Sequence, residues 1–245
     1  NFPIHIKLDT GMHRLGFAPQ DMPELIARLK RQTSVIPRSV FSHLVGSDSA
    51  QFDAFTRRQI ETFENVSEEL QEAFPHKILR HICNTAGIER YPGAQFDMVR
   101  LGLGLYGVNP FTNRMLHNVS TLKTTILQIR DVPQEDSVGY SRKGRLSRDS
   151  RIAAIPIGYA DGLNRRLGNG RAYCLVNGQK AAYVGNICMD MCMIDVTDID
   201  CKEGDKVIIF GDDLPVTVLA DVLDTIPYEI LTSVSNRVKR IYFQD

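Results

Sequence analysis

The feature that most constrains the fold is a change of sequence pattern near residue 109. Before it, short apolar runs alternate with helical segments, which is typical of parallel strands joined by crossover helices. After it, β-branched runs separated by Gly, Asn and Asp replace the helical pattern. The sequence therefore predicts an α/β portion, built as a barrel or an open doubly wound sheet, followed by a mainly antiparallel β domain.

The expected elements follow from apolar periodicity. In the first portion we expect strands at residues 5–8, 39–43, 77–81 and 98–101, and a helix that begins at Asp21. A long helix over residues 50–74 should bury one apolar face, made by Phe52, Phe55, Phe63, Val66, Leu70 and Phe74. In the second portion we expect strands at residues 121–129, 151–157, 172–176, 193–196 and 206–210, a hairpin turn at Asn177-Gly178, and one late helix over residues 216–224.

Composition excludes several classes of protein. Lys plus Arg and Asp plus Glu both number 29, so there is no net field to attract nucleic acid or an anionic membrane. No apolar stretch approaches the ~18 residues of a membrane span, and we expect a cytoplasmic protein. The five cysteines favour reduced, buried thiols. Cys188 and Cys192 flank Asp190 within a buried-strand composition, so no metal site is expected.

Residues 102–107, GLGLYG, fit the spacing of a dinucleotide-binding motif. That motif needs a helix that begins at the glycines, whereas Val108-Asn109-Pro110 follows here. Two other interpretations remain open: glycines that allow tight packing at a strand end, and backbone N–H groups that cradle a phosphate, as in barrel enzymes.

Four motifs, taken together and in this order, resemble the pyridoxal-phosphate-dependent alanine racemases over nearly the whole chain: HIKLDTGMHRLG at residues 5–16, DMVRLG at 97–102, IPIGYADG at 155–162 and GNICMD at 185–190. The resemblance implies the later portion of a (β/α)8 TIM-type barrel at residues 1–115, which binds pyridoxal 5′-phosphate. A β-rich C-terminal domain at residues 116–245 is implied as well. The implied protein is a homodimer with shared active sites that interconverts L- and D-alanine and supplies D-alanine for peptidoglycan.

The lysine that carries the cofactor in this family belongs to a segment expected to precede Asn1. No lysine of this chain lies in a matching context, so we expect the chain to be inactive by itself. Some relatives are fused to a cell-wall ligase domain, so a longer parent protein with such a domain is a further alternative. Two alternatives also stay open: a dimerising domain that binds no cofactor covalently, and a racemase of serine or another small amino acid.

Racemisation needs an acid–base group on each face of the α-carbon, because one group cannot remove a proton from one side and return it to the other. The resemblance implies that these groups are the absent lysine and Tyr140, donated by the partner subunit. Arg100 would face the pyridine nitrogen of the cofactor as a hydrogen-bond donor, since a guanidinium keeps its protons. His43 would bridge Arg100 and Tyr140. Without the resemblance, these three residues would be interpreted as a rim arginine, a core histidine and a surface tyrosine.

The remaining implied contacts fall into two groups. Contacts to the cofactor are implied for His81, Asn84, Thr85, Arg100, Gly102, Leu103 and Asn236. Thr85 stands where relatives usually have serine, and Asn236 where several have tyrosine. Contacts to the substrate are implied for Arg14, Met189, Asp190 and Tyr159, with Met189 offered by the partner subunit through its main chain. Lys7 stands where some relatives carry a carbamylated lysine, although an ordinary solvated lysine is the simpler interpretation.

Overall fold

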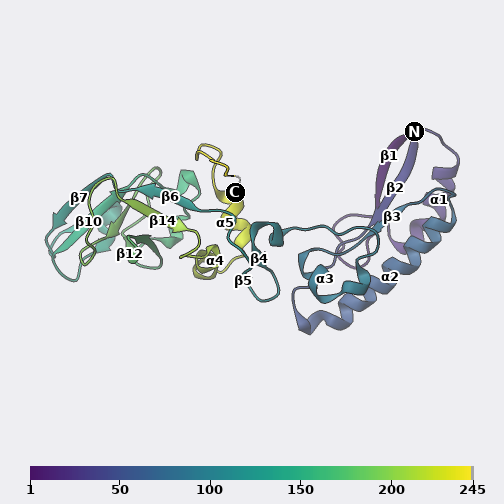
Figure 1. Cartoon of the computed structure of the whole chain (residues 1–245), viewed down its shortest axis with the longest axis horizontal. Coiled ribbons are helices and arrows are strands. Elements are labelled where there is room, and N and C mark those ends of the chain that lie inside the picture. The colour runs from purple at the N-terminus through teal and green to yellow at the C-terminus, as the bar shows by residue number, and fades with distance from the viewer. Residues whose placement is uncertain (244–245) are drawn as a thin grey trace. The chain divides into compact units, whose positions relative to one another are not determined.

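The computed structural model describes residues 1–243 and divides into two compact units, Asn1–Leu116 and a second that begins at His117 (Figure 1). In the first unit, β1 (Phe2–Lys7), β2 (Val35–Phe41) and β3 (Leu79–His81) form a parallel sheet in the order β1-β2-β3. The helices are α1 (Met22–Lys30), α2 (Asp53–Glu72) and α3 (Thr85–Arg90). Helices α1 and α2 make the crossovers that parallel neighbours require.

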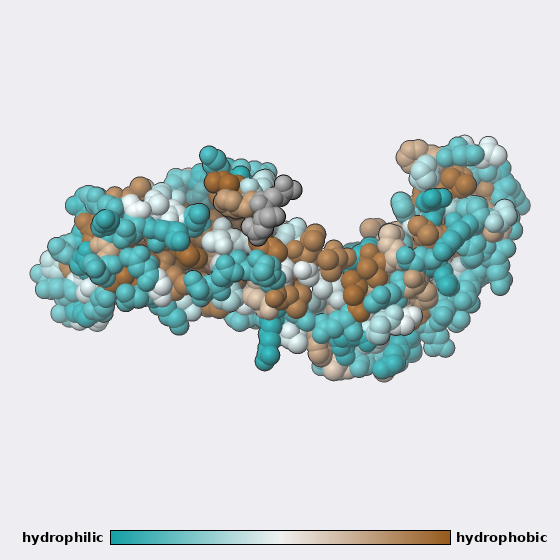
Figure 2. Space-filling model, viewed as in Figure 1, coloured by the Kyte–Doolittle hydropathy of each residue, from teal (hydrophilic) through white to brown (hydrophobic). Residues whose placement is uncertain are grey.

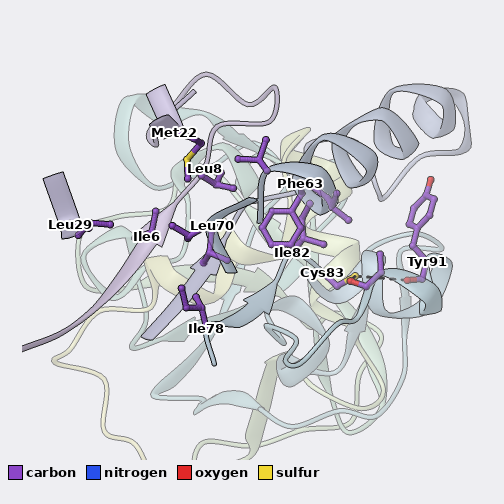
Figure 3. Close-up of a cluster of buried hydrophobic side chains, with 14 residues drawn as sticks. Ile6, Leu8, Met22, Leu29, Phe63, Leu70, Ile78, Ile82, Cys83 and Tyr91 are labelled. Carbon is purple, nitrogen blue, oxygen red and sulfur yellow. Dashed lines mark hydrogen bonds between the residues drawn. The ribbon is translucent and has the colours of Figure 1, made fainter. Parts of the chain in front are cut away.

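The core of the first unit lies between this sheet and its two crossover helices (Figure 3). Ile6 of β1 is buried together with Leu29 of α1 and with Phe63 and Leu70 of α2. These side chains recur at helical steps on α2 and at alternate positions on β1, which is why local periodicity predicts them. The opposite face of β1 carries His5 and Lys7, and the opposite face of β2 carries Ser39 and Phe41.

The predicted face of the long helix is partly wrong. Phe63, Val66 and Leu70 are buried as expected, but Phe52 is 47% exposed. Phe52 belongs to a 3₁₀ turn, η2 (Ala50–Phe52), and therefore lies outside the phase of α2. The buried Gln59 extends the stripe instead, and its amide contacts the main chain of Val45 and His43.

Two predicted strands are wrong. Residues 98–101 form no strand: Asp97 N–H donates to Arg80 O and Arg100 N–H donates to Cys83 O, but these two bonds do not make a ladder. The expected strand at residues 121–129 is two strands, β6 (Leu122–Thr125) and β7 (Gln128–Val132). The chain changes neighbours between them, since Ile126 N–H donates to Asp205 O and Leu127 N–H donates to Ala154 O.

The second unit is built on a seven-stranded antiparallel sheet in the order β6-β14-β11-β12-β13-β10-β7. The other strands are β10 (Ser150–Ile155), β11 (Tyr173–Val176), β12 (Gln179–Val184), β13 (Cys192–Asp195) and β14 (Lys206–Phe210). Edge strands β6 and β7 are consecutive in the chain and only residues 126–127 separate them, so the sheet curls until its two edges meet at this link.

Smaller elements complete the two units. The hairpin turn is confirmed: Asn177 and Gly178 have φ of 48° and 77°, the positive values that a type I′ turn requires. Helix α4 (Val216–Leu223) is close to its predicted bounds, whereas α5 (Pro227–Ser233) was not predicted. Short strand pairs are β4 (Val108–Asn109) with β5 (Arg114–Met115) and β8 (Ser137–Val138) with β9 (Gly144–Arg145).

The surface of each unit mixes hydrophilic and hydrophobic residues (Figure 2). All five cysteines are free; Cys83, Cys174, Cys192 and Cys201 are buried as predicted, whereas Cys188 is partly exposed. Within residues 1–243, no helix has both the length and the apolar composition that a membrane crossing needs.

Candidate active site

Arg100 is held by the main chain at the ends of β2 and β3. Its Nη2 donates to Ser42 O over 2.6 Å and to Ile82 O over 3.2 Å, and its Nη1 donates to His81 O over 3.3 Å. Carboxyl ends of parallel strands are where barrel enzymes place their active sites. The fold therefore fixes a permanent positive charge at this edge of the sheet.

A chain of hydrogen bonds runs from Arg100 across all three strands. Arg100 Nη1 lies 2.7 Å from His81 Nδ1, His81 Nε2 lies 3.2 Å from Ser39 Oγ, and Ser39 Oγ lies 2.5 Å from His5 Nδ1. A guanidinium only donates, so Nδ1 of His81 must accept and its Nε2–H must donate to Ser39. The hydroxyl of Ser39 then donates to His5. One arginine thus sets the proton positions along the whole chain.

His81 is neutral in this environment. Burial, and then the charges of Arg100 and His5, lower its pKa from 6.5 to about 4. Phe41 stacks on its ring, with centroids 5.1 Å apart and parallel planes, and also lies under the Arg100 guanidinium. The orientation of the imidazole is therefore fixed by a stacking partner as well as by both of its nitrogens.

His43 lies on the other side of the guanidinium. Arg100 Nη2 is 3.3 Å from His43 Nδ1, so the structure brings together two residues that the family resemblance implies are neighbours. Burial lowers the pKa of His43, and the charges of Arg100, Arg14 and Lys7 lower it further. A neutral His43 that accepts at Nδ1 keeps its Nε2–H as a donor.

Asp9 shapes the loop that carries Arg14. One oxygen of its carboxylate accepts the backbone N–H groups of Gly11, Met12 and His13, each over 3.0 Å. The backbone hydrogen bond from His13, followed by the one from Gly11 and the side chain of His13, lowers the pKa of Asp9 from 3.8 to about 2. Three donors on one carboxylate oxygen make this a tightly specified turn.

Lys7 lies close to the same loop. Its ammonium donates to Leu15 O over 2.7 Å. Burial lowers the pKa of Lys7; Asp9 opposes the shift, and Arg14 and Arg100 add to it. Three cationic side chains thus act on one another near a single carboxylate, which makes this part of the first unit suited to an anion.

Thr85 connects the start of α3 to the glycine-rich segment. Its hydroxyl accepts the N–H groups of Gly102 over 2.9 Å and Gly104 over 3.2 Å. A Cβ on Gly104 would lie 2.7 Å from the Thr85 methyl group, so glycine is needed there. A short 3₁₀ turn, η4 (Leu103–Tyr106), follows instead of a helix, and this excludes the dinucleotide-binding geometry.

Asn84 caps α3. Its side chain accepts the Gly87 N–H over 2.9 Å and the Ser47 hydroxyl over 2.8 Å, and it donates to Leu44 O. The structure therefore gives both the oxygen and the nitrogen of the Asn84 amide protein partners at the carboxyl end of β3. Its placement fixes the backbone direction on which Thr85 depends.

In the second unit, Tyr140 is presented by a tight turn. It is 71% exposed and begins η5 (Tyr140–Arg142). Ser141 and Arg142 both have positive φ, of 58° and 51°, in the region that non-glycine residues rarely adopt. Asn186, in the segment between β12 and β13, donates to Tyr140 O over 3.3 Å and ties the turn to that segment. Such strain is often found where a side chain is held in a functional position.

Tyr159, Met189, Asp190 and Asn236 also belong to the second unit. Tyr159 and Met189 are 44% and 54% exposed on segments joined through their main chains: Tyr159 N–H donates to Cys188 O and Ala160 N–H donates to Met189 O, each over 3.0 Å. Asp190 is paired with Arg237, and Asn236 is exposed. Within residues 1–243, no three His, Cys, Asp or Glu side chains are grouped to hold a metal ion.

Sequence reasoning missed several residues of this site. Ser39, Phe41 and His5 were not predicted. Ser39 and Phe41 precede the predicted His43 by four and two residues, and His5 precedes the predicted Lys7 by two. Side chains on a strand alternate between faces, so these even spacings were the signal that could have found them. Arg237 was also missed, because its two partners lie far away in the sequence.

The chain matches two family models, "Alanine racemase, N-terminal domain" over residues 1–110 and "Alanine racemase, C-terminal domain" over residues 119–242. It is 38% identical to alanine racemase 1 of Clostridium acetobutylicum, over 99% of this chain and 65% of that protein. The chain spans about 65% of the length of the curated relatives it matches.

Solved structures agree with these matches. An alanine racemase of Clostridium difficile 630 superposes with a TM-score of 0.90 at 34% identity, over 98% of this chain and 64% of that one. The Bartonella henselae alanine racemase, solved with covalently bound pyridoxal phosphate, superposes with a TM-score of 0.85 at 33% identity, over 98% of this chain and 66% of that one. The fold is thus that of a barrel portion followed by a β domain.

Proposed function

The chain belongs to the alanine racemase family, and on that premise we propose that the whole protein interconverts L- and D-alanine with pyridoxal 5′-phosphate as its cofactor. The product D-alanine would serve peptidoglycan synthesis in the cytoplasm. The protein would act as a homodimer, because Tyr140 and Met189 are assigned to the active site of a second copy. The second acid–base group, a lysine, would belong to the part of the protein that this chain does not span.

The observation that carries the proposal is the way Arg100 is held. Its hydrogen bonds to described residues all run through Nη1 and Nη2, to His81, Ser42, Ile82 and His43. Its Nε–H is the donor left for a ligand. A pyridine nitrogen is an acceptor of the right kind, and a donor that keeps its proton leaves that nitrogen unprotonated.

This fit decides what the cofactor would do. When bound, pyridoxal phosphate withdraws electrons from the α-carbon of the amino acid. Because Arg100 would leave the ring nitrogen without a proton, that withdrawal would be weak. We propose that this arrangement favours removal and return of one proton over elimination or transamination.

His43 would act on the catalytic phenol. Its Nδ1 is occupied by Arg100, so its Nε2–H can donate to the oxygen of Tyr140 from a second copy. A hydrogen bond donated to the phenolate favours the charged form of the tyrosine. Tyr140 in that form can take the α-proton from one face of the substrate.

The remaining residues would bind charged groups. Thr85 accepts N–H groups from Gly102 and Gly104, so its own hydroxyl proton is available for a phosphate oxygen, and Gly102 acts through Thr85. We assign the backbone phosphate contact to Leu103. Asn236, where several relatives place tyrosine, would offer only an amide donor to the phosphate.

Substrate binding is assigned to both units. Arg14, on the loop shaped by Asp9, would bind the substrate carboxylate through its guanidinium fork. The Met189 carbonyl already accepts the Ala160 N–H, so Met189 would offer its own N–H to the substrate. The lowered pKa of Lys7 increases its neutral fraction, as carbamylation at this position requires.

The test uses the full-length protein with pyridoxal phosphate, L- or D-alanine and deuterated solvent. We expect racemisation in both directions, with serine turned over more slowly. The substitution Tyr140→Phe should slow deuterium exchange from one enantiomer far more than from the other. Equal, small losses for both enantiomers would refute the assigned role of Tyr140, and a wild-type protein without racemase activity would refute the function.

A further inference from the structure

Arg237 joins two carboxylates of the second unit. Its Nε lies 2.7 Å from Asp161 Oδ1 and its Nη2 lies 2.7 Å from Asp190 Oδ1. The pKa of Arg237 is raised by these two carboxylates, Asp161 first. A guanidinium presents its N–H groups as a planar fork, so it can bridge two fixed acceptors that one ammonium could not span.

Each oxygen of the Asp161 carboxylate accepts a hydrogen bond. Its Oδ2 accepts the Gly158 N–H over 2.8 Å, and its Oδ1 accepts Arg237. Its side chain is only 14% exposed, whereas that of Asp190 is 57% exposed. Asp161 is therefore the fixed end of the bridge, and Asp190 is the end that could move.

The bridge spans three segments that already touch through their main chains. A Cβ on Gly158 would lie 2.3 Å from Met189 O, and a Cβ on Gly162 would lie 2.3 Å from Ser233 O. Ser235 N–H donates to Asp161 O over 3.0 Å. Residues 158–162, 188–190 and 233–237 thus form one surface, which we call the three-segment surface, and it carries Tyr159, Met189 and Asn236.

We propose that Arg237 is a positioning residue that holds the three-segment surface in its working arrangement, and that the carboxylate of Asp190 serves to anchor Arg237 instead of binding substrate. The inference rests on the proposed function, since Met189 and Tyr159 are assigned to the substrate through it. Among the described residues, Arg237 occupies the charged group of Asp190 within the same unit.

An exposed ion pair contributes little by itself. Here one arginine connects two carboxylates, and Asp161 is also bound to backbone, so the pairs act as a network. The expected effect is on the position of the Met189 main chain, and therefore on substrate affinity more than on the chemical step. Removing the ion pair between Asp190 and Arg237 should raise KM for alanine about fivefold and change kcat by less than about twofold.

The test compares Asp190→Asn and Arg237→Lys with Asp198→Asn in the full-length protein. Asp198 pairs with Arg148, outside the three-segment surface, and is the matched control. We expect the first two variants to raise KM and to speed amide hydrogen exchange at Ala160, which donates to Met189 O, while Asp198→Asn changes neither. High salt should raise KM of the wild type toward that of Asp190→Asn.

Two results would overturn the inference. If Asp190→Asn raises KM while Arg237→Lys does not, and exchange at Ala160 is unchanged, Asp190 binds substrate directly. If neither variant changes KM or exchange, Arg237 positions nothing. Should the full-length protein lack racemase activity, the proposed function fails, and exchange at Ala160 still decides whether the bridge holds the surface.

Discussion

Arg100 donates from Nη1 to Nδ1 of His81 over 2.7 Å, and this bond determines the state of the imidazole. Because arginine cannot accept, His81 must stay neutral with its proton on Nε2, where Ser39 receives it. The contact joins the segment after α3 to β3, and Ser39 and His5 extend it over β2 and β1. A cationic His81 would place N–H against N–H at the center of the site.

The first prediction concerns the pH dependence of stability. The folded pKa of His81 is about 4, below its ordinary 6.5, so the unfolded chain binds the proton more tightly. The contribution of neutral His81 is complete above pH 6.5 and is lost as the pH falls from 6.5 to about 4, by up to about 3 kcal/mol. The free energy of unfolding, measured in urea, should depend less steeply on pH between these values in His81→Asn than in the wild type. Asparagine keeps a hydrogen-bond acceptor but does not titrate. If the free energy of unfolding changes with pH equally in the variant and the wild type, the prediction is wrong.

The second prediction concerns Arg100→Lys. An ammonium keeps the charge but cannot reach His81, His43, Ser42 O and Ile82 O together. We expect a loss of about 2–4 kcal/mol of unfolding free energy, measured by denaturant, together with a large fall in kcat. The control is Arg38→Lys, an exposed position on β2, which should be close to neutral. Wild-type stability in Arg100→Lys would show that the carbonyl contacts are dispensable.

The third prediction concerns Asp9→Ala. Three backbone N–H groups lose their common acceptor, which should cost about 1–3 kcal/mol. The loop that carries Arg14 should loosen, so KM for alanine should rise more than kcat falls. Since the folded pKa is about 2 against 3.8, the stabilisation by Asp9 is complete above pH 3.8 and is lost as the pH falls to about 2. Replacement of the exposed Asp48 by alanine is the control; equal effects at both positions would refute the prediction.

The fourth prediction concerns two glycines of the first unit. Gly16 has φ of 126°, and a Cβ there would lie 2.8 Å from Asp9 N and from Leu8 C. Gly16→Ala should therefore break the bridge between Leu8 and Phe17 and lower the free energy of unfolding by about 2 kcal/mol or more. Gly93 has open space around its Cβ position, so Gly93→Ala should be nearly neutral. Thermal unfolding of both variants checks this, and equal midpoints would exclude backbone strain at Gly16.

Local pattern was sufficient for most elements. Strands β1, β2, β11 and β14, and helices α1, α2 and α4, were predicted within a few residues because alternation, helical periodicity and turn residues act over short distances. Prediction from local pattern failed where hydrogen bonds between distant residues determine which secondary structure forms. Residues 98–101 have strand composition but meet β3 only where that strand ends, and residues 126–127 turn toward two different neighbours.

The sequence by itself determined most of the elements and carried the family motifs, and the resemblance that those motifs show implied that Arg100 and His43 belong together. Only the tertiary structure decided that Arg100 is shared among two imidazole rings, of His81 and His43, and three carbonyl groups. It also decided that Ser39 and His5 continue the chain of hydrogen bonds, and that Asp190 is occupied by Arg237. These partners lie 18 to 58 residues away from Arg100 in the sequence, and Arg237 lies 47 residues from Asp190. Which side chains meet across such separations depends on strand register and loop path, and these emerge only when the whole unit has folded.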